Sequence, residues 1–231
     1  MDFSHHPAIW QQYPELVAGV LQAGGIRADV DAGPLVLHHE ATARARLEAA
    51  GGESDLPEVQ AWRRTFARMG LKPTQYRCAS ESLLRRLRKE DAMPRIHPLI
   101  DLCNAVSMAH AIPVAVLDLA HVQGALQVRH AQGNERYLTF GGEWENPERD
   151  EVSFVDEAGH AHARRWTNRQ SGLSAVRAST SQVLVVCEAM HASARDDIPK
   201  LLQALQEALM QVWGTPSRSA ILSAAEPRFT A

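Results

Sequence analysis

Two polar side chains on one predicted helix, Asn104 and Ser107, are the first candidates for chemistry in this sequence. They lie three residues apart in an apolar stretch that follows Pro98 and includes Leu102 and Cys103, so they share one flank of the helix. An amide in that position can orient a water or a polar group of a substrate. An isolated Asn on a helix also satisfies neighbouring backbone groups. The residues alone leave both interpretations open.

Paired histidines are the candidates for a metal. His160 and His162 are two residues apart on a predicted strand and so share a face, but no third ligand is evident and two arginines follow that would repel a cation. His38 and His39 are neighbours on another predicted strand, where they would point to opposite faces. We therefore predict no metal and no cofactor, and a metal-dependent hydrolase at His160 and His162 is kept only as an alternative.

The common catalytic and cofactor signatures do not occur. The sequence contains no GxSxG elbow, no GxxxxGK[ST] loop, no GxGxxG turn, no HExxH helix and no CxxC pair. Its three cysteines, Cys78, Cys103 and Cys187, are an odd number with no metal-binding spacing, which excludes a disulfide framework and a zinc knuckle. We expect them to be reduced and buried.

Basic residues gather in acid-free segments although the net charge is −3. Residues 59–80 contain five bases and no acid, residues 158–187 contain four arginines and no acid, and the acids concentrate at 141–151. In the predicted helix 79–90 the bases crowd the second half, which suits the helix dipole. A local cationic surface on a mildly acidic protein is therefore expected, although a merely solvated face explains that helix equally well.

Hydrophobic periodicity changes along the chain from helical to strand-like. Apolar spacing predicts helices over 8–23, 41–50, 59–69, 79–90, 98–112 and 194–212. Short alternating runs separated by turn residues predict strands over 25–30, 34–39, 114–119, 125–130, 136–140, 152–156, 160–166 and 183–189. The polar tail after Gly214 is expected to be loosely held.

Composition is that of an ordinary globular protein, with 231 residues of which 45% are hydrophobic and 22% charged. No apolar run approaches the roughly 18 residues of a membrane span, and the N-terminus lacks the pattern of a signal peptide, so a cytoplasmic protein is expected. We predict a single α+β domain over 1–231, with an extension at 1–58, a core at 59–190 and a helix and tail at 191–231.

The central stretch HPLIDLCNAVSMAHAIPVAVLDLAHVQGALQVRHAQGNERY resembles the opening of the B3/B4 editing domain of the bacterial phenylalanyl-tRNA synthetase β subunit. The elements Asp-x-x-Asn, Pro-x-x-x-x-Asp and Gly-x-x-x-Val-Arg occur in the family's order and at nearly its spacing. Residues 60–190 resemble even more closely the free-standing proteins that consist of this domain alone. The resemblance implies a B3/B4-like α+β fold, with a β-sandwich-like core of mixed sheets flanked by helices. It also implies hydrolysis of the ester that joins a wrong amino acid to the 3′ adenosine of a tRNA.

The resemblance also implies a set of site residues. Asn104 matches the family's asparagine, and Glu188 lies two positions from its pocket glutamate, which keeps it on the same face of a strand. These two are the predicted catalytic residues, Asn104 to orient a water and Glu188 to bind the α-amino group or act as a weak base. Residues that correspond to the family's pocket are predicted to bind substrate: Cys103, Ser107, Ala115, Trp166, Thr167, Gln170 and Ser174.

The predicted partner is tRNA with its aminoacylated 3′ end. Aromatic rings stack on unpaired bases and arginines bind phosphates, so Trp166 and Tyr76 are candidates to stack on the terminal adenine. The predicted tRNA-binding residues are Tyr76, Arg77, Arg85, Arg86, Arg164, Arg165 and Arg169.

Two functions from different classes remain open. The first is a trans-acting aminoacyl-tRNA deacylase that clears mischarged tRNA through an oriented water. The second is a non-catalytic module that keeps the fold and binds RNA or a free amino acid. The second is favoured by departures from the family pattern: Ala115 stands where the family has a histidine, Cys103 where it has a threonine, and residues 167–171 where it has a glycine-rich segment.

Overall fold

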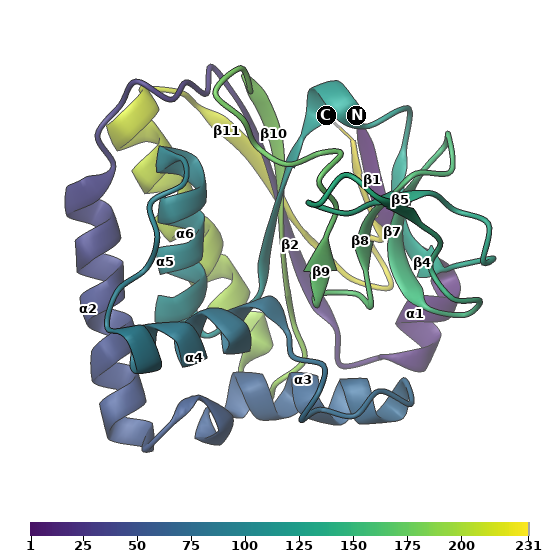
Figure 1. Ribbon diagram of the computed structural model, residues 1–231, viewed down its shortest axis with the longest axis horizontal. Coiled ribbons are helices and arrows are strands. Elements are labelled where there is room, and N and C mark those ends of the chain that lie inside the picture. Colours follow the sequence, from purple (N-terminus) through teal and green to yellow (C-terminus); the bar gives the residue numbers. More distant parts are fainter. Residues whose placement is uncertain (231) are drawn as a thin grey trace.

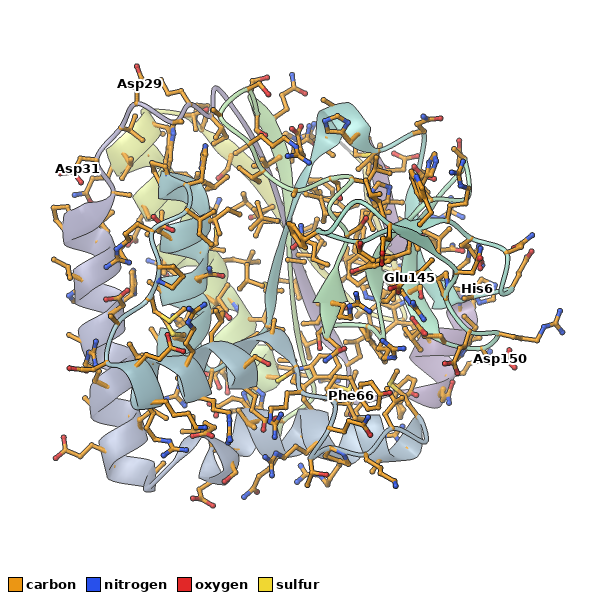
Figure 2. All side chains as sticks on the ribbon, in the orientation of Figure 1. His6, Asp29, Asp31, Phe66, Glu145 and Asp150 are labelled. Carbon is orange, nitrogen blue, oxygen red and sulfur yellow. The ribbon has the colours of Figure 1, made fainter. Side chains whose placement is uncertain are left out.

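Helices cover one face of a four-stranded sheet, and a six-stranded sheet packs on its other face (Figure 1). The computed structural model describes residues 1–230. Helices α2 (Gly33–Ala50), α5 (Pro98–His110) and α6 (Ala194–Trp213) form the helical layer. Helix α3 (Pro57–Arg68) runs beneath the region where the two sheets meet, and Figure 2 shows Phe66 projecting from it. The interface between the sheets is therefore closed from below.

The four-stranded sheet has the order β11-β2-β10-β3 and is antiparallel throughout. Its strands are β2 (Val17–Gly24), β3 (Val114–Asp118), β10 (Gln182–Ala189) and β11 (Ser217–Leu222). All eight residues of β10 pair with β2 on one side, and five of them, from Val183 to Cys187, pair with β3 on the other. The sheet therefore combines strands from near both ends of the chain, β2 and β11, with β3 from its middle.

The six-stranded sheet has the order β12-β1-β4-β7-β8-β9. All its neighbours are antiparallel except β1 and β4, which are parallel. Its strands are β1 (Asp2–His5), β4 (Leu126–His130), β7 (Val152–Asp156), β8 (Ala161–Arg164), β9 (Arg169–Gln170) and β12 (Arg228–Thr230). A short hairpin of β5 (Tyr137–Leu138) and β6 (Trp144–Glu145) forms a separate two-stranded sheet. The two termini therefore lie side by side on this sheet (Figure 1).

Successive side chains along β10 point alternately into two apolar cores. Val183, Val185 and Cys187 pack among the helices, whereas Leu184 and Val186 pack between the two sheets. This period of two is what an extended strand imposes on its side chains. The next residue of the second set is Glu188. The register of β10 therefore places a carboxylate in the apolar space between the sheets.

A third apolar cluster joins the lower helices. Helix α4 (Ala79–Glu90) packs Leu84 and Leu87 against α2 and α5, which also contribute Leu47 and Met108. Proline occupies the first turn of α3 and α5, where its missing N–H costs nothing. Among the described residues, no helix is long and apolar enough to cross a membrane.

Several elements confirm the predictions from periodicity. The helices predicted over 59–69, 79–90 and 194–212 and the helix after Pro98 are present, as are strands in the segments 114–119, 125–130, 152–156, 160–166 and 183–189. The α+β class and the core of mixed sheets flanked by helices are confirmed. The division of the chain into an extension, a core and a tail stays a prediction.

Predictions near the ends of the chain were wrong. Residues 8–23 are a short helix α1 (Pro7–Gln12) followed by β2, because Pro14 interrupts the helix and β2 is buried on both faces, which removes its alternation. Residues 34–39 begin helix α2 and 25–30 form no strand. The tail forms β11 and β12, because the edges of both sheets offer backbone partners to it.

Helix α6 lies very close to β2 at Gly19, and a substitution there tests this packing. A Cβ on Gly19 would lie 2.6 Å from Cys187 Sγ and 2.8 Å from Ile198 Cγ2. We expect Gly19→Ala to lower the free energy of unfolding by about 1–3 kcal/mol in urea denaturation, since overpacked cores cost that much. Gly24→Ala, whose Cβ would meet nothing nearer than 3.9 Å, is the matched control and should leave stability unchanged. Equal stability of both variants would contradict the packing of α6 on β2.

Candidate functional site

A small cavity lies between the sheets at the lower ends of β3 and β10. It has a volume of about 60 Å³, and its walls are largely apolar. Five of the predicted site residues line it together: Ala115, Trp166, Thr167, Gln170 and Glu188. Other lining residues were not predicted, among them Pro113, Phe154, Ala163 and Val186. Ala115 and Val186 are direct partners in the β3–β10 ladder, so the strand register brings this part of the wall together.

Glu188 is the acidic residue of the cavity, and its side chain is only 2% exposed. Its Oε1 accepts a hydrogen bond of 2.8 Å from Trp166 Nε1 and lies 2.6 Å from His5 Nε2. Within the described chain, its Oε2 has no hydrogen-bond partner and is not fully enclosed. Two donors therefore fix the carboxylate while one oxygen stays available to a ligand.

His5 is a site residue that sequence reasoning missed. It lies on β1, 183 residues before Glu188, and is 1% exposed. Its Nδ1 is buried with no partner among the described residues, and its ring packs 4.9 Å from that of Trp10. No local pattern around His5 signals this role, because β1 and β10 belong to different sheets and the contact forms only where the two sheets pack together.

Trp166 enters the cavity through an unusual backbone conformation. Arg165 and Trp166 both have positive φ angles, 47° and 58°, in a region that side chains rarely adopt and that costs on the order of 1–3 kcal/mol. The indole packs edge-on against Tyr13 and Trp62, at 4.9 and 5.3 Å between ring centroids. As a result Trp166 faces the interior and Arg165 faces an outer groove.

The segment after Trp166 closes the cavity with side-chain and backbone hydrogen bonds. Gln170 Nε2 donates to the carbonyl of Val116, and the Thr167 carbonyl accepts from the N–H of Ala79. Arg169 also lines the cavity, but its side chain is 41% exposed and its Nη1 lies 3.3 Å from Glu145. Figure 2 shows Glu145 on the side of the molecule that carries the six-stranded sheet. An Arg169–Glu145 ion pair therefore lies beside the cavity.

The predicted residues on α5 lie elsewhere. Cys103 is buried in the helical core, where burial raises the pKa of its thiol to about 12. Ser107 donates a hydrogen bond of 2.6 Å to the carbonyl of Ile112. Asn104 is half-buried on the same helix and is not among the residues that line the cavity. The structure thus places Asn104 in the helical layer and Glu188 between the sheets, on opposite faces of the four-stranded sheet.

Ser174, another predicted substrate contact, belongs to a buried network. Its Oγ lies 2.9 Å from His162 Nδ1, and His162 Nε2 lies 3.1 Å from Asp156 Oδ2. Burial alone would raise the pKa of Asp156, but hydrogen bonds from His162 and from two backbone N–H groups outweigh it and lower the pKa to about 2. Ser174 is 0% exposed, so a substrate cannot reach this serine, and both nitrogens of His162 are occupied.

A basic groove adjoins the cavity on the outer side of Trp166. It has a volume of about 460 Å³, and it is lined by the bases Lys72, Arg149 and Arg165 and by Tyr76, together with the acids Glu148, Asp150 and Glu151. The guanidinium of Arg165 lies 5.0 Å from the centroid of the Tyr76 ring, a cation–π contact. Within the described chain, Lys72 and Arg149 form no ion pair. These two bases are therefore free to bind an anion.

Most other predicted tRNA-binding arginines are paired with acids. Arg164 is 4% exposed and binds Glu145 and Glu151, at 2.7 and 2.9 Å. The remaining pairs are Arg77 with Glu81, Arg85 with Glu53 and Arg86 with Glu90. Arg164 thus stabilises the six-stranded sheet from inside, and the bases of α4 are largely neutralised by neighbouring acids.

Comparison with known proteins identifies the family. A family model described as the B3/4 domain matches residues 61–208, more than half of the chain. The protein belongs to the B3/4 domain family. Among solved structures, this B3/4 protein is similar to an N-terminal fragment of the phenylalanyl-tRNA synthetase β-subunit from Pyrococcus horikoshii, with 12% sequence identity and a TM-score of 0.43. That match covers 52% of this chain and 41% of the fragment. No curated protein matches the sequence.

The contacts of Glu188 predict the stability of two variants of the B3/4 protein. Glu188→Ala leaves the N–H groups of Trp166 and His5 buried without an acceptor, so we expect it to lower the free energy of unfolding by about 1–3 kcal/mol. Glu188→Gln keeps an acceptor oxygen and should remain within about 1 kcal/mol of the wild type. Urea denaturation measures both. If Glu188→Ala is as stable as Glu188→Gln, the carboxylate does not organise the cavity.

Proposed function

We propose that this B3/4 protein is an aminoacyl-tRNA deacylase that acts in trans on mischarged tRNA. The observation that carries the proposal is the fixed carboxylate of Glu188, which lines an apolar cavity beside a basic groove and has one oxygen without a hydrogen-bond partner among the described residues. An aminoacyl ester needs little from an enzyme because it is already activated. An oriented water and a site that holds the aminoacyl group in place are sufficient.

In the proposed reaction, a water oxygen attacks the ester carbonyl and the bond from that carbon to the ribose oxygen breaks. The ribose oxygen takes up a proton, and the products are a free amino acid and a tRNA with its terminal hydroxyl restored. Glu188 Oε2 accepts a hydrogen bond from the α-amino group or from the water. Asn104, predicted to orient the water, lies in the helical layer, so the proposal rests on Glu188.

Cavity size favours a small amino acid. A volume of about 60 Å³ is well below the roughly 150 Å³ of a cavity that binds benzene. The nearby walls are apolar, formed by Ala115, Phe154, Ala163 and Val186. We therefore propose that the amino acid removed has a small, apolar side chain.

A non-catalytic amino-acid- or RNA-binding module is the second candidate. It is favoured by the placement of Asn104 outside the cavity and by the tight engagement of Glu188 Oε1 with Trp166 and His5. Among the described residues that line the cavity, none is a serine, cysteine or histidine that could act as a nucleophile. Both candidates use the same cavity, so only hydrolysis separates them.

Loss of the ester from a panel of mischarged tRNAs tests the first candidate. We expect the wild type to deacylate tRNA that carries a small apolar amino acid, and Glu188→Gln to lower kcat/KM at least about 100-fold, as removal of a catalytic group commonly does. Glu207→Gln on the outer face of α6 is the control and should retain full activity. Absence of hydrolysis for every tRNA would contradict the proposal, and saturable binding without hydrolysis would establish the second candidate.

The salt dependence of tRNA binding tests whether tRNA binds in the basic groove. We expect the double variant Lys72→Gln, Arg149→Gln to weaken binding of uncharged tRNA and to reduce the slope of log K against log salt by roughly 1.5, since each phosphate contact contributes about 0.7 to 0.9. Arg85→Gln with Arg86→Gln on α4 is the matched comparison, because both bases are paired with acids. A larger effect from the α4 pair would place the tRNA on that helix instead.

A further inference from the structure

Three potential metal ligands converge outside the cavity, at the lower edge of the four-stranded sheet. Glu58 lies in the first turn of α3, His191 follows β10, and Asp197 lies in the first turn of α6. Each offers one ligand atom, and these atoms all lie within 4.8 Å of one another. Three separate elements therefore contribute to one cluster.

Two polar atoms of the cluster are buried without a partner among the described residues. Glu58 and His191 are each 6% exposed, and the unpartnered atoms are Glu58 Oε2 and His191 Nδ1. Their other atoms are occupied: Glu58 Oε1 accepts from Arg46 Nη2 at 2.6 Å, and His191 Nε2 lies 3.0 Å from Asp197 Oδ2. Unsatisfied buried groups are rare and costly. Two in one cluster indicate a missing ligand.

Helix dipoles explain only part of this arrangement. Acids in the first turn of a helix are stabilised by its N-terminus, and Asp197 also accepts hydrogen bonds from the Ser193 hydroxyl and from Lys200 Nζ. Asp197 is thus satisfied without a ligand. The dipole gives no reason for a buried imidazole nitrogen and a buried carboxylate oxygen to remain unpaired beside it.

We propose that Glu58, His191 and Asp197 bind a divalent transition metal ion, with Zn²⁺ as the best match. One imidazole with two carboxylates is a ligand set that suits zinc, whereas calcium and magnesium prefer oxygen ligands alone. Three protein ligands leave a position for water.

The charges around the cluster are compatible with a cation. Arg46 and Lys200 balance the two carboxylates, but Lys200 is 66% exposed and can turn away. Burial, together with the charges of His39 and Arg46, lowers the pKa of the nearby His110 to about 4 against the opposing effect of the two acids. His110 is therefore neutral at pH 7 and adds no repulsion.

An ion can reach the cluster from solvent. His191 also lines a surface cavity of about 200 Å³ together with Glu15, Met190 and Arg195. The bound ion would tie α3 and α6 to the end of β10 that carries Glu188. His191 follows Glu188 by three residues, and Glu58 lies one helical turn before Trp62, whose Nε1 donates to the Glu188 carbonyl at 3.3 Å. The proposed ion therefore holds the strand end behind the cavity.

Titration calorimetry with Zn²⁺ on the full, chelator-treated chain tests the proposal. We expect one ion per chain and a Kd at least tenfold weaker in Glu58→Gln and in His191→Ala. His121→Ala, which removes an exposed histidine, is the control and should bind as the wild type does. Saturating Zn²⁺ should raise the Tm of the wild type by roughly 5–10 °C, as a ligand at about 100 times its Kd would, and should leave that of Glu58→Gln unchanged.

Three results would overturn the proposal. They are no heat of binding, binding that His191→Ala and Glu58→Gln leave intact, and a Tm shift equal in wild type and variants. The last two would show an adventitious ion at surface histidines only. Circular dichroism checks that each variant folds, and Asp197→Asn, which preserves the shape of the side chain, replaces any variant that does not. Because the readouts are binding and stability, the outcome is independent of whether the protein deacylates tRNA.

Discussion

The hydrogen bonds of the buried Glu188 carboxylate constrain the interior between the two sheets. A charged group in an apolar interior is costly unless donors surround it. Its donors come from distant parts of the chain, His5 on β1 and Trp166 after β8, while Trp62 on α3 donates to its carbonyl. One residue on the central strand thus joins α3, through its carbonyl, to the six-stranded sheet, through its carboxylate, and the cavity lies where these elements meet.

The conformation of Arg165 and Trp166 separates an apolar cavity from a basic groove. Two consecutive residues with positive φ direct the indole inward and the guanidinium outward. The apolar cavity and the basic groove consequently lie on either side of a single residue step. A ligand with a small apolar group at the end of a polyanion matches this geometry, and it is the arrangement on which the deacylase proposal depends. Strain of this kind persists only where surrounding packing enforces it, here through Tyr13 and Trp62.

The cluster of Glu58, His191 and Asp197 lies next to the strand end that carries Glu188. It lies just beyond the end of β10. Trp62 on α3 donates to the Glu188 carbonyl in this strand, and a ligand atom of Glu58 on the same helix lies within 4.8 Å of one of His191. Rigidity at the strand end matters because Glu188 is held at hydrogen-bond distance from two rigid rings. Helix α3 contacts the residue that organises the cavity through the hydrogen bond from Trp62 Nε1 to the Glu188 carbonyl.

Local patterns in the sequence were sufficient for much of the fold and for part of the site. Helices such as 79–90, the strand 183–189 and the face on which Glu188 lies follow from periodicity, because side chains repeat every 3.6 or 2 residues whatever the context. The family resemblance placed Ala115, Trp166, Thr167, Gln170 and Glu188 in one pocket, and the structure brings these five together. Tertiary structure decided the rest. Whether 17–24 and the tail are strands depends on partners far along the chain. His5 meets Glu188 only where the two sheets pack together, and the buried Arg164 finds its acids, Glu145 and Glu151, on other segments of the chain. Such contacts are non-local, so no stretch of sequence contains them.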